Sequence, residues 1–577
     1  MKAFRKLMIL LDRRQKLNMV YLLFLMLISA LLEATSITML FPVITAIMEP
    51  GGVDSGLTGW LYRTLHAADV TQFVIMVMAG MIVLFILKNL FLLYEQIKLF
   101  KFIFDNQFKT SARMMRNYLH RNYEEYLNAD TAVIQRNITT DVSNMYYYIL
   151  ALLQVMSEVI MFMAFVVMMV AMNVLMTVVI AATLIITLLI VKKVIKPVVR
   201  KAGQDNQDFY AGEFKWISQA VAGIKEMKIA GREQFFQDQF MRYGKGYVSA
   251  IKKYNVFSSI PRLLIETVSI ASMLGYLIVV AATGGDMSRM TSVIAIFAVA
   301  AMRMMPCANR INNYLTSLAY YEPFLMGVSE TLQSDVHAEN ATKSFDFADT
   351  PKMDVHDVIE LKDITYAYPN TDKLIFDHAH MEIPIGKSVG VVGTTGAGKS
   401  TVIDILLGLL QLQDGEVCAD GVDIRSNYHG WLKNVGYIPQ MIFMLDDTIR
   451  NNVAFGIPEE KIDDARVMQA LKEAKLDEFV RNLPDGLDTK IGERGVRLSG
   501  GQRQRIGIAR ALMEDPEILI MDEATSALDN DTEKAIMESI QDFQGKKTLV
   551  IIAHRLQTIE KCDIVYRVSE GKILVDR

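Results

Sequence analysis

Long apolar runs dominate the first half of the chain and stop near residue 325. They predict membrane-spanning helices, because a helix needs roughly 20 mostly apolar residues to cross the hydrocarbon core of a bilayer. We expect six spans, at residues 18–42, 72–97, 148–172, 174–195, 256–283 and 291–315. The first run is too long for the core of a signal peptide and lacks a small-residue cleavage site, so we interpret it as a retained span.

Lysine and arginine are unevenly divided among the segments that join these spans. The N-terminus and residues 98–145 and 192–253 are rich in both, whereas residues 49–71 and 284–290 hold one arginine each. Because basic segments stay on the cytoplasmic side, this bias places both termini in the cytoplasm and makes the two long basic segments cytoplasmic extensions. The outer stretch LTGWLYRTL, at 57–65, predicts either a helix lying flat at the membrane interface or an ordinary packed loop helix.

The pattern changes after residue 330. Residues 331–355 are polar and predict a linker. From 356 to 577, short apolar runs typical of buried strands, such as SVGVVG and EILIMDE, alternate with amphipathic helical patterns. We therefore expect a multidomain protein, with an all-α six-helix transmembrane domain over residues 1–330 and a soluble α/β domain over residues 356–577.

The composition agrees with this division and removes other classes of protein. Hydrophobic residues make up 52% of the chain, which favours a membrane protein over a soluble one. The formal net charge of −4 gives no reason to expect a nucleic-acid partner. The three cysteines indicate no disulfide framework.

A glycine-rich run follows a strand pattern and opens a helix, which is the context that a phosphate-binding P-loop requires. The run and the residue after it are Gly393, Thr394, Thr395, Gly396, Ala397, Gly398, Lys399, Ser400 and Thr401. Small residues let backbone N–H groups wrap around phosphates, and the helix N-terminus adds partial positive charge. In this role Lys399 reaches the β- and γ-phosphates of ATP, and Ser400 coordinates Mg²⁺.

Two adjacent carboxylates end a second strand pattern. Asp522 and Glu523 directly follow the apolar run ILIM. Asp522 suits a role in holding Mg²⁺, and Glu523 suits a general base or water-orienting group for attack on the γ-phosphate. His554 ends another apolar strand pattern, TLVIIAH, and is a candidate for contact with the γ-phosphate region. A lone histidine at such a place is more often structural.

Residues 498–502 read LSGGQ and are preceded by IGERGVR. This run, which contains Ser499, Gly500, Gly501 and Gln502, resembles the signature of the ATP-binding-cassette (ABC) transporters. The resemblance extends over the whole of residues 356–577 and implies a P-loop NTPase domain of ABC type that hydrolyses ATP.

The remaining motifs of that family follow in the same order. By resemblance, Tyr368 in YAYPN stacks on adenine, Gln440 in YIPQ is the Q-loop glutamine, Asp529 in SALD belongs to the D-loop and His554 is the switch histidine. The Mg²⁺ ligands that this implies are Ser400, Gln440 and Asp522. No essential position departs from the pattern, which favours an active cassette with ATP and Mg²⁺ as cofactors.

The chain carries one P-loop and one signature. In the ABC family the signature completes the ATP site of the opposite cassette, so the resemblance implies a homodimer with two ATP sites. The order of membrane domain and cassette resembles that of exporters. The absence of a peptidase-like domain before the first span disfavours a peptide exporter that also cleaves a leader. The resemblance also places coupling helices near Asp130–Asn137 and Phe214–Gln219.

Several ionisable residues lie within or beside the predicted spans, where a charge costs about 2.5–3.5 kcal/mol on insertion scales. The basic ones are Lys88, Arg262, Arg303 and Arg310, and the acidic ones are Glu33, Glu158 and Glu266. One interpretation is structural: Arg262 pairs with Glu266 along one helix face, and Glu33 and Glu158 neutralise Arg303 or Arg310. The other is functional: the four basic residues form a belt in the cavity of the dimer and bind phosphate oxygens.

Short stretches of the membrane half resemble bacterial flippases of polyprenyl-pyrophosphate-linked oligosaccharides. They are LLEATSITMLFPVI, PRLLIE, RMMP and GIKEMKIAGRE. The resulting hypothesis is an ATP-driven exporter or flippase of a lipid-linked anionic substrate in the bacterial cytoplasmic membrane, in contact with membrane lipids. The alternatives are a general lipid, drug or peptide exporter and, less favoured because Glu523 and His554 are intact, an ATP-gated channel or regulator.

Overall fold

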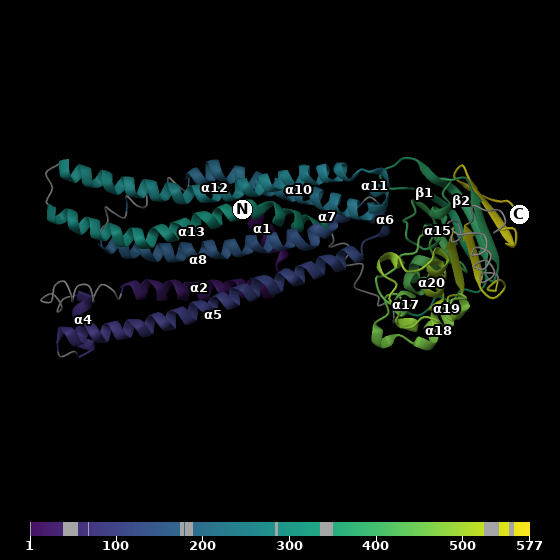
Figure 1. Cartoon of the computed structure of the whole chain (residues 1–577), viewed down its shortest axis with the longest axis horizontal. Coiled ribbons are helices and arrows are strands. Elements are labelled where there is room, and N and C mark those ends of the chain that lie inside the picture. Colours follow the sequence, from purple (N-terminus) through teal and green to yellow (C-terminus); the bar gives the residue numbers. More distant parts are fainter. Residues whose placement is uncertain are drawn as a thin grey trace. The chain divides into compact units, whose positions relative to one another are not determined.

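The computed structural model describes residues 2–38, 56–66, 69–127, 129–172, 178, 189–282, 287–334, 350–523, 542–552 and 559–577. The chain divides into two compact units. The first comprises Met1–His120 and Ala129–Asn340, and the second comprises Arg121–Asn128 and Ala341–Arg577. The first unit is helical and the second is built around two β-sheets (Figure 1), as the change of hydrophobic pattern predicts.

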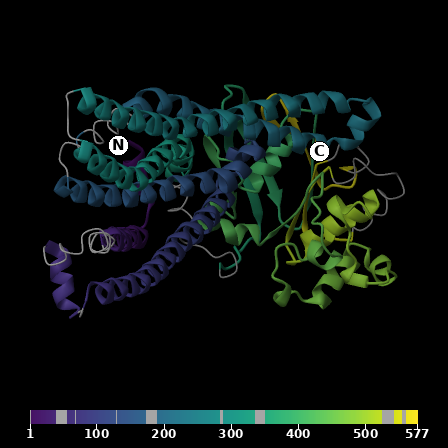
Figure 2. The same ribbon diagram turned by 60° about the vertical axis from the view of Figure 1, so that its left-hand side comes forward.

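The helices described in the first unit are mostly long. They are α1 (Lys2–Leu10), α2 (Arg13–Thr38), α4 (Gly56–Thr64), α5 (Val70–Leu119), α7 (Thr131–Arg136), the π-turn η2 (Asn137–Asp141), α8 (Val142–Met172), the π-turn η3 (Val191–Ile195), α10 (Lys196–Ala222), α11 (Ile224–Ala230), α12 (Glu233–Ala282) and α13 (Met287–Ser334). Helices α8, α10, α12 and α13 pack together, and α2 lies beside α5. Both arrangements can be followed in Figures 1 and 2.

The predicted spans can be compared with these helices. Among the described residues, three helical segments are long and apolar enough to cross a membrane: Arg13–Glu33, Val70–Leu119 and Thr131–Ala164. They contain most of the first three predicted spans. The fifth and sixth predicted spans fall within α12 and α13. Most of the span predicted at 174–195 lies outside the described residues.

The stretch predicted as an outer helix is helical over α4. Its side chains at Leu61 and Tyr62 pack against Phe73 and Val77 of α5, and the rings of Tyr62 and Phe73 lie 5.3 Å apart. Trp60 is exposed. One face of α4 therefore packs as an ordinary loop helix does, while its tryptophan remains accessible.

Glycines allow the helices of the first unit to cross closely. A Cβ atom on Gly203 of α10 would lie 2.1 Å from the backbone oxygen of Tyr320 in α13. No side chain fits there, so this crossing requires glycine. Between α10 and α12, Gly212 faces the ring of Tyr243 and Gly246 faces the ring of Phe209, so that each helix presents a gap to an aromatic side chain of the other.

Two sheets form the second unit. The antiparallel sheet has the order β2 (Leu374–Pro384), β1 (Val358–Ala367), β4 (Asp414–Ala419) and β5 (Val422–Asp423). The other has the order β10 (Lys572–Val575), β9 (Ile564–Ser569), β3 (Ser388–Gly393), β8 (Thr548–Ile552), β7 (Ile518–Asp522) and β6 (Val435–Ile438), with only β10 antiparallel to its neighbour. Buried strands such as β7 and β8 are apolar throughout, because residues on both faces of the sheet are covered.

The helices described in the second unit are α6 (Tyr123–Leu127), α15 (Lys399–Leu406), α16 (Tyr428–Leu432), α17 (Ile449–Val453), α18 (Asp464–Glu473), α19 (Asp477–Arg481) and α20 (Gly500–Leu512). Among them, α15, α16 and α20 pack against the strands, and α15 and α20 begin at the P-loop and at the signature. Short 3₁₀ turns lie at η5 (Ile424–Asn427), η6 (Glu459–Lys461), η7 (Gly486–Asp488) and η8 (Glu493–Gly495). Trp431 of α16 is completely buried, and its indole N–H donates to the backbone oxygen of Leu406 at 3.0 Å. The core therefore fixes the end of α15, the helix that follows the P-loop.

Candidate functional site

The glycine-rich run forms a loop between β3 and α15, as predicted. Gly396 and Gly398 have φ angles of 81° and 106°, a region that glycine adopts without strain. Gly398 is the N-cap residue of α15 and provides no side-chain hydrogen bond. The first N–H groups of α15 are therefore left without a capping side chain, which suits binding of a phosphate.

Lys399 lies beneath this loop rather than in solvent. Its side chain is buried, and Nζ donates to the backbone oxygens of Gly393 and Thr394, each at 3.1 Å. These two carbonyl groups compensate the buried ammonium group. Thr394, Thr395 and Gly396 at the tip of the loop are exposed. The loop thus presents its backbone outward, with a cation directly behind it.

The end of β7 lies next to the P-loop. Because β3 and β7 are parallel strands separated only by β8, their carboxyl ends meet at one edge of the sheet. The Oγ of Ser400 donates to Oδ1 of Asp522 at 3.4 Å. A hydroxyl and a carboxylate oxygen are ligands that Mg²⁺ accepts alongside phosphate oxygens and water. The two predicted ligands are therefore brought together by the fold.

A second carboxylate increases the negative charge at this edge. Burial raises the pKa of the Asp404 carboxyl, on α15, to about 6, and the nearby charge of Asp522 adds to the rise. Within the described residues, no group of three or more His, Cys, Asp or Glu side chains forms a metal cage. Mg²⁺ with its phosphates and waters fits such an incomplete, acidic site. Asp404 belongs to no motif, and only its place on the buried face of a predicted helix marks it in the sequence.

Gln440 and Glu523 are in direct contact. The Nε2 of Gln440, just beyond β6, donates to Oε2 of Glu523 at 2.7 Å. The adjacency follows from the strand order, since β6 pairs with β7. Glu523 has a φ of 46°, an uncommon value for a residue with a side chain.

Tyr368 lies near the P-loop helix. Its hydroxyl is 2.9 Å from Oγ1 of Thr401, and its ring lies 5.3 Å from that of Tyr366 in an edge-to-face arrangement. The structure therefore brings together the residue predicted to stack on adenine and the P-loop helix.

The signature forms the start of α20. Ser499 is its N-cap residue: Ser499 Oγ accepts from the backbone N–H of Gln502 at 3.2 Å, and Gln502 Oε1 accepts from the backbone N–H of Ser499 at 2.8 Å. This reciprocal pair is a capping box, which fixes the direction of the helix. Gly500 and Gly501 follow in the first turn, where their backbone N–H groups add to the positive end of the helix.

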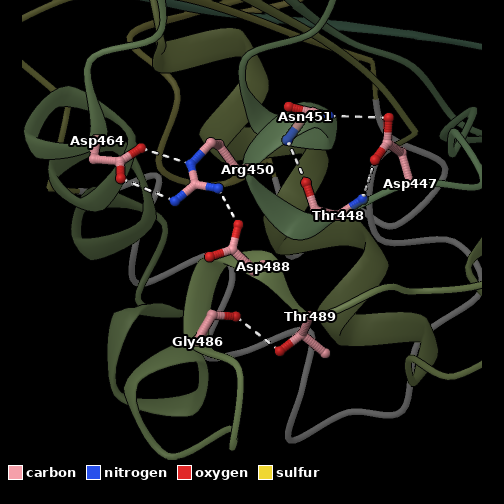
Figure 3. Close-up of polar contacts among 8 residues, drawn as sticks. All are labelled: Asp447, Thr448, Arg450, Asn451, Asp464, Gly486, Asp488 and Thr489. Atoms are coloured by element: carbon pink, nitrogen blue, oxygen red, sulfur yellow. Dashed lines mark hydrogen bonds and ion pairs between the residues drawn. The ribbon is translucent and has the colours of Figure 1, made fainter. Parts of the chain in front are cut away.

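A polar cluster supports the segment before the signature (Figure 3). Arg450 of α17 binds Asp464 through two hydrogen bonds of 2.7 and 2.9 Å and also contacts Asp488. Figure 3 shows the guanidinium group lying between these two carboxylates. The guanidinium of Arg450 holds the pKa of Asp464 below its usual value. Hydrogen bonds from Asn451 and from the backbone of Thr448 have the same effect on the pKa of Asp447.

Two predicted site residues lie outside the described residues. They are His554, within residues 553–558, and Asp529, within residues 524–541. The other predicted residues of the cassette, from Tyr368 to Glu523, are described, and the P-loop, the end of β7 and Gln440 are brought together.

One contact of the second unit was not predicted. The Oε1 atom of Glu124, in α6, accepts hydrogen bonds from the backbone N–H of Gln411 at 2.9 Å and from the hydroxyl of Tyr366 at 3.2 Å. Residues 121–128 thereby belong to the cassette unit, whereas the stretch predicted to contact it, Asp130–Asn137, lies in the helical unit. The signal in the sequence is the acidic, aromatic run YEEYL after the apolar pattern ends.

The basic residues of the membrane half have different environments. Arg310 of α13 pairs with Glu158 of α8 at 2.6 Å, and the thiol of Cys307 lies 3.2 Å from the same carboxylate. The structural alternative, an ion pair between helices, therefore describes Arg310. Lys88 is buried, with its ammonium group 5.0 Å from the centre of the Phe85 ring.

Arg262, unlike Arg310, forms no ion pair with the acidic residue expected to neutralise it. Both Arg262 and Glu266 are exposed on α12, and no ion pair joins these two described side chains. The predicted pairing along one helix face is therefore absent. The side chain of Arg303 lies outside the described part of the structure, although its position falls within α13.

Parts of this chain are similar in sequence to curated proteins. The ATP-dependent lipid A-core flippases of Vibrio cholerae and Pectobacterium atrosepticum are 41% and 42% identical to it over 221 and 217 residues. These alignments cover 38% and 37% of this chain and the same shares of the two relatives, so the chain matches less than two fifths of each relative's length.

A solved structure titled "Structure of a bacterial Atm1-family ABC exporter with ATP bound" matches over most of the chain. The TM-score is 0.72 with 21% identity, covering 97% of this chain and 94% of that one. At this identity the likeness concerns the fold. It is consistent with a helical transmembrane domain followed by an α/β nucleotide-binding domain.

Two family models match the two halves of the chain. The model described as the ABC transporter transmembrane region matches residues 22–305, and the model described as ABC transporter matches residues 376–526. Together with the P-loop, the end of β7 and the signature helix, these matches show that the chain belongs to the ABC transporters and fuses a transmembrane region to one cassette.

Proposed function

We propose that this protein is an ATP-driven exporter or flippase that moves an anionic, lipid-linked substrate across the bacterial cytoplasmic membrane. The observation that carries the proposal is the assembled ATP site, in which Gln440 contacts Glu523 beside the P-loop, on a chain that also contains a membrane domain. Turnover of ATP serves a transporter, whereas a gate or a regulator has little need of it.

The residues of the cassette divide the chemistry of hydrolysis among them. Lys399 and the backbone of the loop hold the phosphates, and Glu523 orients a water or accepts its proton, with Gln440 fixing the position of the carboxylate. Ser400, Asp522 and Gln440 would hold Mg²⁺, which would supply positive charge to offset the charge of the phosphates. His554 would contact the γ-phosphate region.

The working form would be a homodimer. Ser499 and the two glycines after it lie at the exposed start of α20, where a second cassette could use them. Two identical chains would then form two ATP sites, each from one P-loop and the signature of the partner.

The segment 121–128 would link the cassette to the membrane domain. Glu124 holds it to the cassette through Tyr366 and Gln411, and the segment directly follows α5 along the chain. A movement of the cassette on binding ATP would therefore be passed to α5 by the shortest covalent path.

The substrate is inferred from charge. Arg262 is exposed without an ion pair to Glu266, and with Lys88 and Arg303 it would bind an anionic head group. Arg310 is already paired with Glu158, so it would contact the head group only as part of that ion pair. A polyprenyl-pyrophosphate oligosaccharide fits this set, because a pyrophosphate offers several oxygens to arginine forks while its tail stays in lipid.

A second candidate substrate is a lipid A-core glycolipid. The support is that the relatives in Vibrio cholerae and Pectobacterium atrosepticum, which match part of this chain, are lipid A-core flippases. Both candidates are phosphate-bearing amphiphiles, so they place the same demand on the basic side chains. A drug or peptide exporter would instead depend on apolar and aromatic walls.

The test is transport by the purified protein in liposomes. ATP-dependent flipping would be followed with a fluorescent polyprenyl-pyrophosphate oligosaccharide and, in parallel, with lipid A-core. The Glu523→Gln variant removes hydrolysis, Arg262→Ala and Arg303→Ala remove basic side chains, and Arg242→Ala is a matched control at an exposed site on α12.

We expect wild type and Arg242→Ala to flip one of the two lipids and the other three variants to lose at least nine tenths of the rate. Undiminished flipping by both Arg262→Ala and Arg303→Ala would reject the basic belt. ATP hydrolysis without flipping of either lipid would reject the substrate class while leaving the cassette intact.

A further inference from the structure

A cavity lies between α2 and α5, separate from the basic residues discussed above. It has a volume of about 410 Å³ and is bounded by the first turns of α2 and the middle of α5. Its charged residues are Asp12, Arg14, Lys98, Lys101, Asp105 and Lys109. Cavities of roughly 300–1,000 Å³ are the usual size for binding a small molecule.

The charge of this cavity is positive. Four of its charged side chains are cations and two are carboxylates. Within the described part of the chain, none of the four cations forms an ion pair, and Lys98 lies over the ring of Tyr94 at 5.3 Å. All four are exposed, so their N–H donors are available to a ligand. Phosphate oxygens are the acceptors that such a group of donors favours.

The walls of the cavity are held in place by hydrogen bonds between the two helices. Gln15 Nε2 donates to Oδ1 of the buried Asn106 at 3.0 Å, and Asn106 Nδ2 donates to the backbone oxygen of Phe102 at 2.6 Å. Farther along, the hydroxyls of Tyr21 and Tyr94 are 3.1 Å apart. The cavity is therefore built by both helices and does not depend on surface lysines alone.

The sequence places this cavity at the cytoplasmic boundary of the bilayer. The apolar run of α2 begins among the residues that line the cavity, after Arg14 and Gln15, and the apolar run of α5 ends just before Lys98. Tyrosines such as Tyr21 and Tyr94 prefer the membrane interface, and lysines and arginines mark the cytoplasmic side. Beyond the tyrosines, the exposed side chains of Phe24 and Leu93 provide an apolar surface.

We propose that the cavity between α2 and α5 binds the phosphate head group of an anionic lipid from the cytoplasmic leaflet. The head group lies among Arg14, Lys98, Lys101 and Lys109, and the acyl chains lie along the exposed apolar faces of α2 and α5. Basic pockets between spanning helices on this side of a membrane recognise such head groups, with about 1 kcal/mol for each lysine or arginine near the surface. The proposal does not depend on the identity of the transported substrate.

The test measures lipid binding and not transport. The full-length protein, purified in detergent, is titrated with phosphatidylglycerol or phosphatidylcholine and the bound lipid is counted by native mass spectrometry. The test variant is Lys98→Gln/Lys101→Gln/Lys109→Gln. The matched control is Lys245→Gln/Lys252→Gln/Lys253→Gln, three exposed lysines on α12 just before the fifth predicted span. A Lys98→Arg/Lys101→Arg/Lys109→Arg variant retains the charge.

We expect the test variant to bind phosphatidylglycerol at least tenfold more weakly than wild type, and the control and the arginine variant to stay within about threefold. Binding of phosphatidylcholine should be the same in all four proteins. Equal loss in the test and control variants would overturn the proposal, since general surface charge would then explain the binding.

A competition experiment with inorganic phosphate distinguishes a lipid head group from free phosphate as the ligand of this cavity. We expect phosphate at millimolar concentration to leave bound phosphatidylglycerol in place, because it lacks the acyl chains. Displacement of the lipid by phosphate alone, or saturable binding of phosphate with no binding of lipid, would overturn the lipid assignment. Melting temperatures of the variants within about 2 °C of wild type exclude misfolding as the cause of a loss.

Discussion

Gln440 and Glu523 are joined by a hydrogen bond of 2.7 Å, although 82 residues separate them along the chain. The bond places an amide group on the carboxylate that is the candidate base for ATP hydrolysis. A glutamine at this point fixes the position of the carboxylate. The contact arises because each residue follows one of two paired parallel strands, β6 and β7.

The first prediction concerns this carboxylate. Glu523→Gln should lower the rate of ATP hydrolysis by about 10²–10⁴-fold, the usual contribution of a general base, while ATP still binds. The two properties are measured by phosphate release and by binding of a fluorescent ATP analogue. Glu514→Gln, an exposed glutamate in the same unit, is the control and should hydrolyse ATP normally. Hydrolysis by Glu523→Gln at more than a third of the wild-type rate would assign the base elsewhere.

The second prediction concerns the ion pair between α8 and α13. Glu158 has a side-chain exposure of 13%, so removing Arg310 leaves a poorly solvated carboxylate, and removing Glu158 leaves the half-exposed Arg310 in the membrane domain without its partner. We expect Glu158→Gln and Arg310→Gln each to lower the free energy of unfolding by about 1–3 kcal/mol, and the double variant to lose less than the sum. Thermal unfolding in detergent measures all three. Strictly additive losses would show that the two side chains do not interact.

The third prediction concerns the crossing of α10 and α13. Gly203→Ala should destabilise the membrane unit by about 1–3 kcal/mol, because the new Cβ would meet the backbone oxygen of Tyr320 and force the helices apart. Gly244→Ala is the matched control, since the nearest atom to its Cβ is 3.7 Å away. It should be neutral or slightly stabilising. Equal unfolding temperatures for both variants would contradict the close crossing.

The fourth prediction concerns acid and the cluster in Figure 3. The pKa of Asp464 is lowered by Arg450 in the folded protein, so the folded state binds a proton there less readily than the unfolded state. The resulting stability is present above the unfolded pKa of about 4 and is lost as the pH falls through the lower folded pKa.

Arg450→Gln should therefore lower stability at pH 7, by under about 1 kcal/mol because Asp464 is 55% exposed. The difference from wild type should shrink as the pH falls below about 4 and through the lower folded pKa of Asp464. Chemical denaturation at pH 7, 5 and 3.5 measures it, with the exposed Arg425→Gln as control. A difference that grows toward low pH would contradict the assigned sign.

The sequence predicts what each motif contributes but not which partners the fold supplies. Lys399, Ser400 and Asp522 are recognisable because phosphate and metal chemistry restricts residue type and spacing, and the strand order then brings them together. The strands of the cassette are also predictable, since buried parallel strands are continuous apolar runs.

Contacts between distant segments leave no such pattern. Arg310 could be read equally as a cargo ligand or as half of an ion pair, because the choice depends on whether Glu158 faces it across two helices. In the sequence Glu124 is one of two adjacent glutamates that are typical of an exposed segment. In the structure it accepts two hydrogen bonds, from Tyr366 and Gln411. Its role depends on packing between segments more than 240 residues apart in the chain.

The length of α5 has a mechanical consequence. Its 50 residues form one continuous helix about 75 Å long, of which the hydrocarbon core of a bilayer covers about 30 Å. The part of α5 beyond the apolar run, from Lys98 to Leu119, extends for about 33 Å as a continuous helix. A change of about 5° in the tilt of this part displaces its end by about 3 Å, the rise of two helical residues. A small tilt at one end of this helix therefore becomes a displacement of several ångströms at its other end, because the helix has no break along its length.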